Sequence, residues 1–310
     1  MAILDRAIVR LLPAVPKPVV RKISERYIAG TELADACRLV KALNAEGKLA
    51  TIDVLGEEIA SPDEARVLTG AYLDVLAAIE RADLDANVSI KPTGFGLKLG
   101  YELFRKNLSA VVRDAAARGN FVRIDMEEAS TTDDTLALYR ELRGEGRHNV
   151  GIVLQASLRR TIEDVGDLAP LRPNVRICKG IYVEAEEIQY HGFDEVRDAF
   201  VRALDDLLGA GCYVGIATHD EWLLAEGRRL VAVHGRASAG YEFQMLLGVR
   251  AELGDRLIAD GHRLRIYVPF GRHWYEYSLR RLQENPKIAG YIAADTLGRL
   301  LPGRGNGRPT

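Results

Sequence analysis

The sequence predicts an α/β protein: a distorted (β/α)8 barrel of the TIM type with an N-terminal helical arm. Eight short runs rich in β-branched residues recur along the chain, and helix-like segments separate them. Strands that alternate with helices pair in parallel, and eight such units close a barrel. An open doubly wound sheet is the alternative. That fold usually has a glycine-rich phosphate loop after its first strand, and Gly56–Glu58 is not one.

Residues 1–47 are expected to form the helical arm, 48–300 the barrel, and 301–310 a disordered tail rich in Gly, Pro and Arg. The predicted strands begin at Thr51, Asn87, Phe121, Val150, Val175, Tyr213, Gly240 and Leu264. The helix after the first strand should begin at Pro62 behind a Ser61 cap, because Ser is favoured at the cap and Pro at the first helical position. A later helix-like segment, 194–211, ends in Gly, as helices often do.

The composition is that of an ordinary soluble globular protein, with 47% apolar and 28% charged residues. A net charge of −2 argues against nucleic-acid binding through bulk charge. Three cysteines without metal-ligand spacing fit a reduced, cytoplasmic compartment. No run approaches the roughly 18 apolar residues of a membrane span. The amphipathic N-terminal segment is expected to pack on the same domain, and peripheral contact with the inner face of the cell membrane is the alternative.

The predicted strand ends are polar, and barrel enzymes place their chemistry at the C-terminal ends of strands. These ends carry Glu57, Ser89, Lys91, Asp125, Glu127, Gln155, Arg176, Lys179, Thr218, His219, Asp220, Glu242, Gln244 and Tyr267. A lone strand-end Lys or Asp is more often half of a structural ion pair than catalytic. The hypothesis of an active site depends on convergence, because all eight predicted strands deliver polar ends to one rim.

A polar stripe follows the last predicted strand. Tyr277, Arg280, Arg281 and Glu284 have the spacing that places them on one helix face. Two adjacent arginines beside an aromatic hydroxyl suit a small carboxylate, because the guanidinium fork matches the geometry of a carboxylate. The stripe therefore predicts a site for an amino acid or an organic acid.

Other chemistries have weaker support. His219 and Asp220 are adjacent, but the sequence has no HExxH motif and no Cys/His cluster, so no metal is expected. There is no GxSxG motif of a serine hydrolase. A Schiff-base lyase that uses Lys91 or Lys179 as its amine stays open, because spacing alone does not exclude it.

Seven segments in order, from about Asp53 to Pro286, resemble the strand ends of proline dehydrogenases, most of all the short monofunctional bacterial enzymes. They read VSIKPTGFG, RIDMEE, VLQAS, VRICKGIY, ATHDE, YEFQML and YVPFGRHWYEYSLRRLQENP. The resemblance implies a distorted barrel with non-covalent FAD at its C-terminal face. It also implies oxidation of L-proline to Δ1-pyrroline-5-carboxylate by hydride transfer to flavin N5, with a membrane quinone as electron acceptor. A pyrroline-5-carboxylate dehydrogenase that takes the product is an implied partner.

The resemblance assigns roles on the substrate side. Arg280 and Arg281 would bind the proline carboxylate, and Lys91 would add a third positive charge. Asp125 would hold Tyr267 and nearby groups in position, and Glu57 would pair with a substrate arginine to gate the site. The proline ring would lie against Tyr267, Tyr277 and Leu246.

The resemblance also assigns the cofactor side. Arg176 would approach flavin N5, and Gln155 would approach the pyrimidine edge. The rest of FAD would contact Lys179, Gly180, Tyr182, Thr218, His219 and Glu284. Ile181 departs from the family pattern, because relatives usually have a small Ala beside the flavin. It is the one feature that favours a non-catalytic binding barrel, which would keep the arginine pair without turnover.

Overall fold

The computed structural model describes residues 26–56, 59–275, 277 and 278. The described residues between 29 and 272 belong to one compact unit, and residues 26–28, 273–275, 277 and 278 belong to a second. Within the described residues, no helix is both long enough and apolar enough to cross a membrane. Residues 1–25 of the predicted arm, 1–47, and the whole tail, 301–310, lie outside the described residues, so the predicted domain limits stay a prediction.

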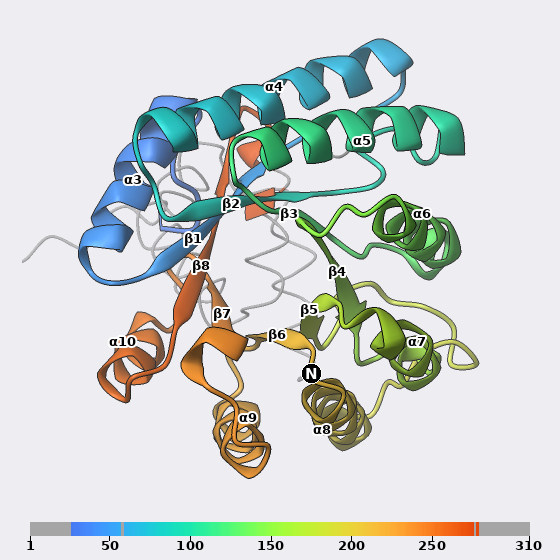
Figure 1. Cartoon of the computed structure of the whole chain (residues 1–310), viewed down its shortest axis with the longest axis vertical. Coiled ribbons are helices and arrows are strands. Elements are labelled where there is room, and N and C mark those ends of the chain that lie inside the picture. Colours follow the sequence, from blue (N-terminus) through green and yellow to red (C-terminus); the bar gives the residue numbers. More distant parts are fainter. Residues whose placement is uncertain (1–25, 57–58, 276, 279–310) are drawn as a thin grey trace, which may run out of the picture. The chain divides into compact units, whose positions relative to one another are not determined.

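The larger unit alternates helices and strands from end to end, and its helices surround the strands (Figure 1). The order is α3 (Leu33–Ala45), β1 (Leu49–Val54), α4 (Pro62–Arg81), β2 (Ala86–Ile90), α5 (Tyr101–Ala117), β3 (Val122–Ile124), η2 (Ala129–Thr131), α6 (Thr132–Gly144), β4 (Val150–Gln155), α7 (Thr161–Leu168), η3 (Ala169–Leu171), β5 (Asn174–Cys178), α8 (Phe193–Gly209), β6 (Tyr213–Ala217), α9 (Glu221–Val233), η4 (Ser238–Gly240), β7 (Tyr241–Leu246), α10 (Ala251–Ala259) and β8 (Leu264–Phe270).

The strands form a closed barrel in sequence order, β1 to β8, and every pairing between neighbours is parallel. The ring closes where β1 pairs with β8, with Asp53 opposite Pro269. The predicted (β/α)8 fold is therefore confirmed. All eight predicted strands form, and the largest error in a start is at the first, which begins at Leu49 rather than Thr51.

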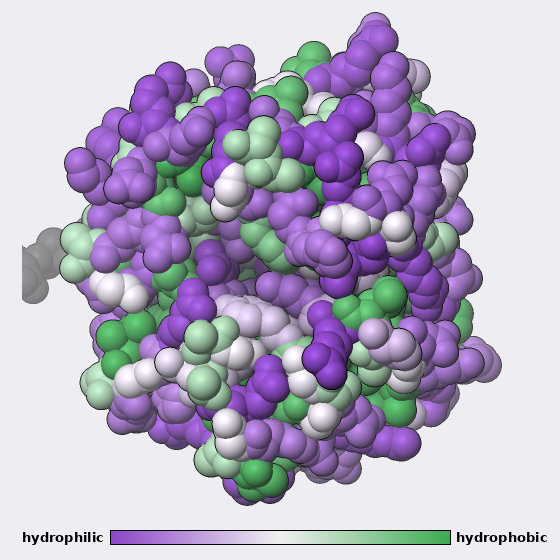
Figure 2. Space-filling model, in the orientation of Figure 1, coloured by the Kyte–Doolittle hydropathy of each residue, from purple (hydrophilic) through white to green (hydrophobic). Residues whose placement is uncertain are grey.

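Each described α-helix of the larger unit has buried residues on one face, and many of them pack against the barrel. Helix α4 begins as predicted: the Ser61 hydroxyl accepts a hydrogen bond from the Glu64 N–H at 3.3 Å, and Pro62 occupies the first helical position. Its buried residues, among them Tyr72 and Val75, join one apolar core shared by the strands and helices. Burial of that core is the main force that holds the barrel together. The outer face seen in Figure 2 is mostly hydrophilic, with apolar side chains scattered over it.

Candidate active site

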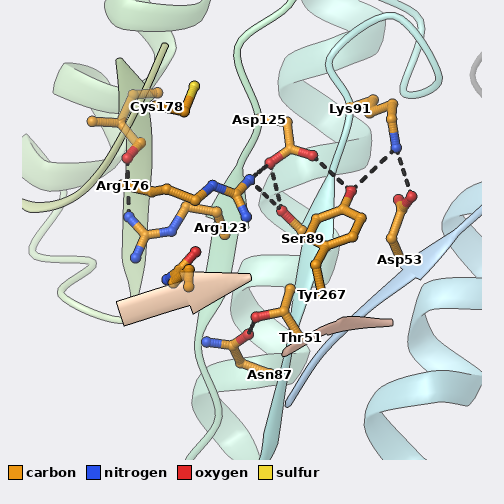
Figure 3. Close-up of polar contacts among 12 residues, drawn as sticks. Thr51, Asp53, Asn87, Ser89, Lys91, Arg123, Asp125, Arg176, Cys178 and Tyr267 are labelled. Atoms are coloured by element: carbon orange, nitrogen blue, oxygen red, sulfur yellow. Dashed lines mark hydrogen bonds and ion pairs between the residues drawn. The ribbon is translucent and has the colours of Figure 1, made fainter. Parts of the chain in front are cut away.

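A chain of polar contacts links four strands at their C-terminal ends (Figure 3). The Lys91 ammonium, just after β2, donates to the Tyr267 phenol oxygen on β8 at 3.4 Å. That phenol donates to the Asp125 carboxylate beyond β3 at 3.0 Å. The other Asp125 oxygen accepts from the Arg176 guanidinium on β5 and, at 2.6 Å, from the Ser89 hydroxyl on β2. Strand pairing thus brings predicted residues that are far apart in sequence into one network.

The network continues from Lys91 to a buried acid on β1. The Lys91 ammonium lies 2.7 Å from the Asp53 carboxylate, and the Asp53 side chain is fully buried. On its other side, Asp53 lies 3.0 Å from the Tyr72 hydroxyl. Burial raises the pKa of Tyr72 well above its usual value, and the Asp53 negative charge raises it further. Tyr72 therefore stays a neutral phenol behind the ion pair.

Arg176 is buried within the barrel, and its guanidinium lies 5.4 Å from the centre of the Tyr267 ring. Burial lowers the pKa of Arg176, and the nearby Tyr267 and Asp53 act in the opposite direction. A buried guanidinium needs compensation, and here Asp125 and the Ser89 hydroxyl both accept from it, the latter at 3.1 Å. The result is a cation held inside the barrel by two acceptors.

The backbone after β5 passes close to β4. Gly180 has a φ of +99°, and a Cβ on it would come within 2.3 Å of the Ser157 hydroxyl oxygen and 3.1 Å of the Gln155 amide oxygen. Glycine is therefore required at this position for both backbone conformation and space. The Gln155 amide nitrogen donates to the Glu127 carbonyl at 2.8 Å, which fixes that side chain at the rim.

A second ion-pair cluster lies between the ends of β5 and β6. Lys179 contacts the Asp220 carboxylate at 2.6 Å, and Arg197 donates two hydrogen bonds to it at 2.9 and 2.7 Å. Burial alone would raise the pKa of Asp220, but the hydrogen bonds from Arg197 and Lys179 hold it well below its usual range. The Arg197 guanidinium also lies 4.1 Å from the centre of the exposed Phe193 ring.

Three further predicted residues are held by backbone contacts on the same rim. The His219 Nε2 accepts from the Leu246 N–H at 2.9 Å, so a neutral ring carries its proton on Nδ1. The Thr218 hydroxyl accepts from the Asp220 N–H at 3.1 Å. The Tyr182 carbonyl accepts from Gln189 at 2.7 Å.

Several predicted residues cannot be placed in this network. Glu57, Arg280, Arg281 and Glu284 lie outside the described residues. Tyr277 is described and buried, and it belongs to the second compact unit. Their predicted roles stay predictions.

Sequence reasoning left some residues of the network out of the predicted site. Asp53 was not singled out, although its spacing from Thr51 places the two on the same face of a strand otherwise rich in apolar residues. A carboxyl group in such a run was the available signal, because buried charges are paired. The sequence marks Ser89 as a polar strand residue without a role, and Arg197 and Tyr72 belong to helices whose predicted ends carry no information on side-chain partners.

The ion pairs also bear on the Schiff-base alternative. An amine must be unprotonated to attack a carbonyl carbon. Lys91 is paired with Asp53 at 2.7 Å and Lys179 with Asp220 at 2.6 Å. Each lysine nitrogen is thus engaged by a carboxylate, an arrangement that does not favour a Schiff-base role.

Comparison with known proteins gives a consistent result. A family profile described as proline dehydrogenase matches residues 36–293. The chain is 36% identical over 279 residues to the proline dehydrogenase of Deinococcus radiodurans. The aligned region covers 89% of this chain and 90% of that protein. It is 36% identical over 269 residues to proline dehydrogenase 1 of Bacillus subtilis strain 168, with 87% and 89% covered.

A solved structure shares the fold. Proline utilization A (PutA) from Bdellovibrio bacteriovorus, inactivated by N-propargylglycine, superposes with a TM-score of 0.80 at 24% identity. The match covers 89% of this chain and 34% of that one, so the chain spans about a third of the larger protein. Because the family profile matches residues 36–293 and the two relatives above are each 36% identical, the chain belongs to the proline dehydrogenase family of oxidoreductases.

Proposed function

We propose that this chain oxidises L-proline to Δ1-pyrroline-5-carboxylate, the first step of proline catabolism, with non-covalent FAD as its cofactor. The observation that carries the proposal is the linked network of Lys91, Tyr267, Asp125 and Arg176 at one rim of the barrel, in a chain of this family. The network supplies a cation for a carboxylate and an aromatic wall for an apolar ring.

On the substrate side, the Lys91 ammonium, which is among the residues that the structure describes, is the cation that we assign to the proline carboxylate. Asp125 accepts a hydrogen bond from the Tyr267 hydroxyl, so the lone pairs of the phenol oxygen face Lys91. The Tyr267 ring is thereby held at its hydroxyl, and the Arg176 guanidinium lies 5.4 Å from the ring centre. A fixed wall and a fixed cation together orient a small ring, which lowers the entropy cost of reaction. Arg280 and Arg281, by resemblance, complete the carboxylate site.

On the cofactor side, the donor set fits a flavin nucleotide. Arg176 is a buried cation that donates to Asp125, and Gln155 offers an amide at the end of the neighbouring strand β4. Gly180 keeps the rim uncovered by a side chain at the point where β4 and β5 meet. When bound, FAD supplies the acceptor for the hydride that leaves the ring carbon next to nitrogen. A cation such as Arg176 near the flavin favours its electron-rich reduced form.

Two further steps extend the proposal beyond this chain. A quinone in a membrane would take the electrons from the reduced cofactor, which requires peripheral contact of a cytoplasmic protein with the inner face of the cell membrane. A pyrroline-5-carboxylate dehydrogenase would consume the product. Both follow from the family resemblance.

The test is anaerobic mixing of the purified, FAD-loaded protein with L-proline. We expect loss of the visible absorbance of oxidised flavin, together with one equivalent of the cyclic imine detected by mass spectrometry. D-proline is the control ligand. Proline binding without bleaching would support the non-catalytic alternative, and a fully loaded protein that neither binds proline nor bleaches would overturn the proposal.

A further inference from the structure

Asp53 is one of the buried charged residues to which the proposed reaction gives no task, and it contacts Lys91, a proposed substrate-binding residue. Its side chain is fully buried, and its carboxylate contacts the Lys91 ammonium at 2.7 Å. Burying an ionised carboxylate costs free energy unless a partner compensates it. An apolar side chain at this barrel position would avoid that cost, so the acid calls for an explanation.

We propose that Asp53 is a positioning residue: its carboxylate holds the Lys91 ammonium, in its charged form, at the place where it binds the substrate carboxylate. This inference rests on the proposed function, in which Lys91 binds that carboxylate.

The geometry supports a holding role. Lys91 has a flexible four-carbon chain, and its side chain is 15% exposed. Asp53 fixes one side of its ammonium at 2.7 Å, and the Tyr267 phenol fixes another at 3.4 Å. Behind Asp53, the Tyr72 hydroxyl lies 3.0 Å from the carboxylate and 2.7 Å from the Ser89 carbonyl, so the two acceptors share its one proton. The ammonium is thus supported from β1, β8 and, through Asp53, from α4.

The charges around Lys91 favour a role for Asp53 in keeping it protonated. Two other charged groups contact Tyr267, the phenol beside Lys91: Arg176 lies 5.4 Å from its ring centre, and Asp125 accepts from its hydroxyl and from Arg176. Asp53 contacts the ammonium directly. The phenols of Tyr267 and Tyr72 contribute hydrogen-bonding groups at their ordinary neutral charge.

The test is direct binding of tetrahydrofuran-2-carboxylate to the FAD-loaded protein, measured by isothermal titration calorimetry. This ligand has the ring and carboxylate of proline, and it lacks the amine whose own titration would obscure that of Lys91. Removing the Asp53 charge lets burial favour the neutral Lys91 amine, so ligand affinity should be lost as pH rises. We expect Asp53→Asn to bind about tenfold to a hundredfold more weakly than wild type at about pH 9.5, with a smaller difference at about pH 6.5.

A double-mutant cycle separates positioning from general stability. In a Lys91→Ala background the ammonium is absent, so adding Asp53→Asn should leave the ligand affinity unchanged. Asp255→Asn is the matched control, because it removes another Lys–Asp contact of 2.7 Å, with Lys48, from the outside of the protein. This control should bind the ligand as wild type does. Equal or tighter binding by Asp53→Asn at about pH 9.5, or the same loss in the Lys91→Ala background, would overturn the inference.

A second comparison does not depend on the folding of Asp53→Asn. Lys91→Arg carries a charge that does not titrate in this range. If Asp53 keeps Lys91 protonated, wild type and Lys91→Arg should have parallel, flat affinity profiles up to about pH 9.5. An affinity that falls in wild type alone would contradict the inference. Bleaching by L-proline tests the proposed function separately, so either claim can fail without the other.

Discussion

Replacing Tyr267 with Phe tests the central contact of the network. The change removes the hydroxyl that donates to Asp125 at 3.0 Å and accepts from Lys91 at 3.4 Å. It keeps the ring, whose centre lies 5.4 Å from the Arg176 guanidinium. The variant therefore separates the polar role of the phenol from its role as a wall.

The expected magnitude follows from the loss of one hydrogen bond to a charged carboxylate. Such bonds contribute about 1.5–3 kcal/mol, which corresponds to roughly a tenfold to a hundredfold change. Asp125 keeps its contacts with Arg176 and Ser89, so the carboxylate stays compensated and the barrel should fold normally. We expect kcat/KM for L-proline to fall by that factor, with FAD content unchanged.

The assay is steady-state oxidation of L-proline with a dye as electron acceptor, alongside the ratio of flavin to protein absorbance. Tyr213→Phe is a matched control, since its phenol donates to Glu242 at 2.9 Å in the same barrel and is not assigned to the site. Unchanged kcat/KM in Tyr267→Phe would refute the reasoning, and so would an equal loss in both variants.

Three further predictions concern the cofactor, pH and packing. Gly180→Ala should lower the FAD content, measured as bound flavin, because its Cβ would meet the Ser157 hydroxyl at 2.3 Å. Gly47→Ala is the control: Gly47 has a φ of +74° but lies in open space, so this change should leave the FAD content unchanged. The pKa of Asp220 is held below its unfolded value, so its ion pairs should stabilise the fold fully above about pH 4 and lose that contribution as pH falls further. In denaturant unfolding, the difference between wild type and Asp220→Asn should therefore shrink below about pH 4, and a constant difference would contradict this. Gly151→Ala should lower the free energy of unfolding by about 1–3 kcal/mol, because its Cβ would lie 2.5 Å from a backbone carbonyl of the next strand.

The order of strands and helices could be predicted because each strand is a local pattern. Runs such as the one from Val150 carry enough β-branched residues to be recognised alone. Parallel closure then places their C-terminal ends at one rim, so Lys91, Asp125, Arg176 and Tyr267 could be grouped before any coordinates were known.

The partners within that group could not be predicted in the same way. Asp53 and Lys91 are 38 residues apart, and their contact depends on the register between two strands. The residues near Asp53 in the sequence do not indicate that Lys91 is its partner. Arg197 presents the same difficulty, because its link to Asp220 depends on how α8 lies beside the end of β6. Local periodicity predicts which face of a helix is buried, but it does not predict which side chains of other elements that helix contacts.

The closing seam between β1 and β8 has a consequence for synthesis in the cell. The guanidinium of Arg265 donates to the carbonyl of Ala50 at 2.6 Å, across 215 positions of the chain. During synthesis on a ribosome, the edge of β1 that pairs with β8 stays unpaired until nearly the whole polypeptide has been made. Until then two open edges are available to other nascent chains. Factors that shield emerging polypeptides should therefore affect the yield of this protein more than they affect its final stability.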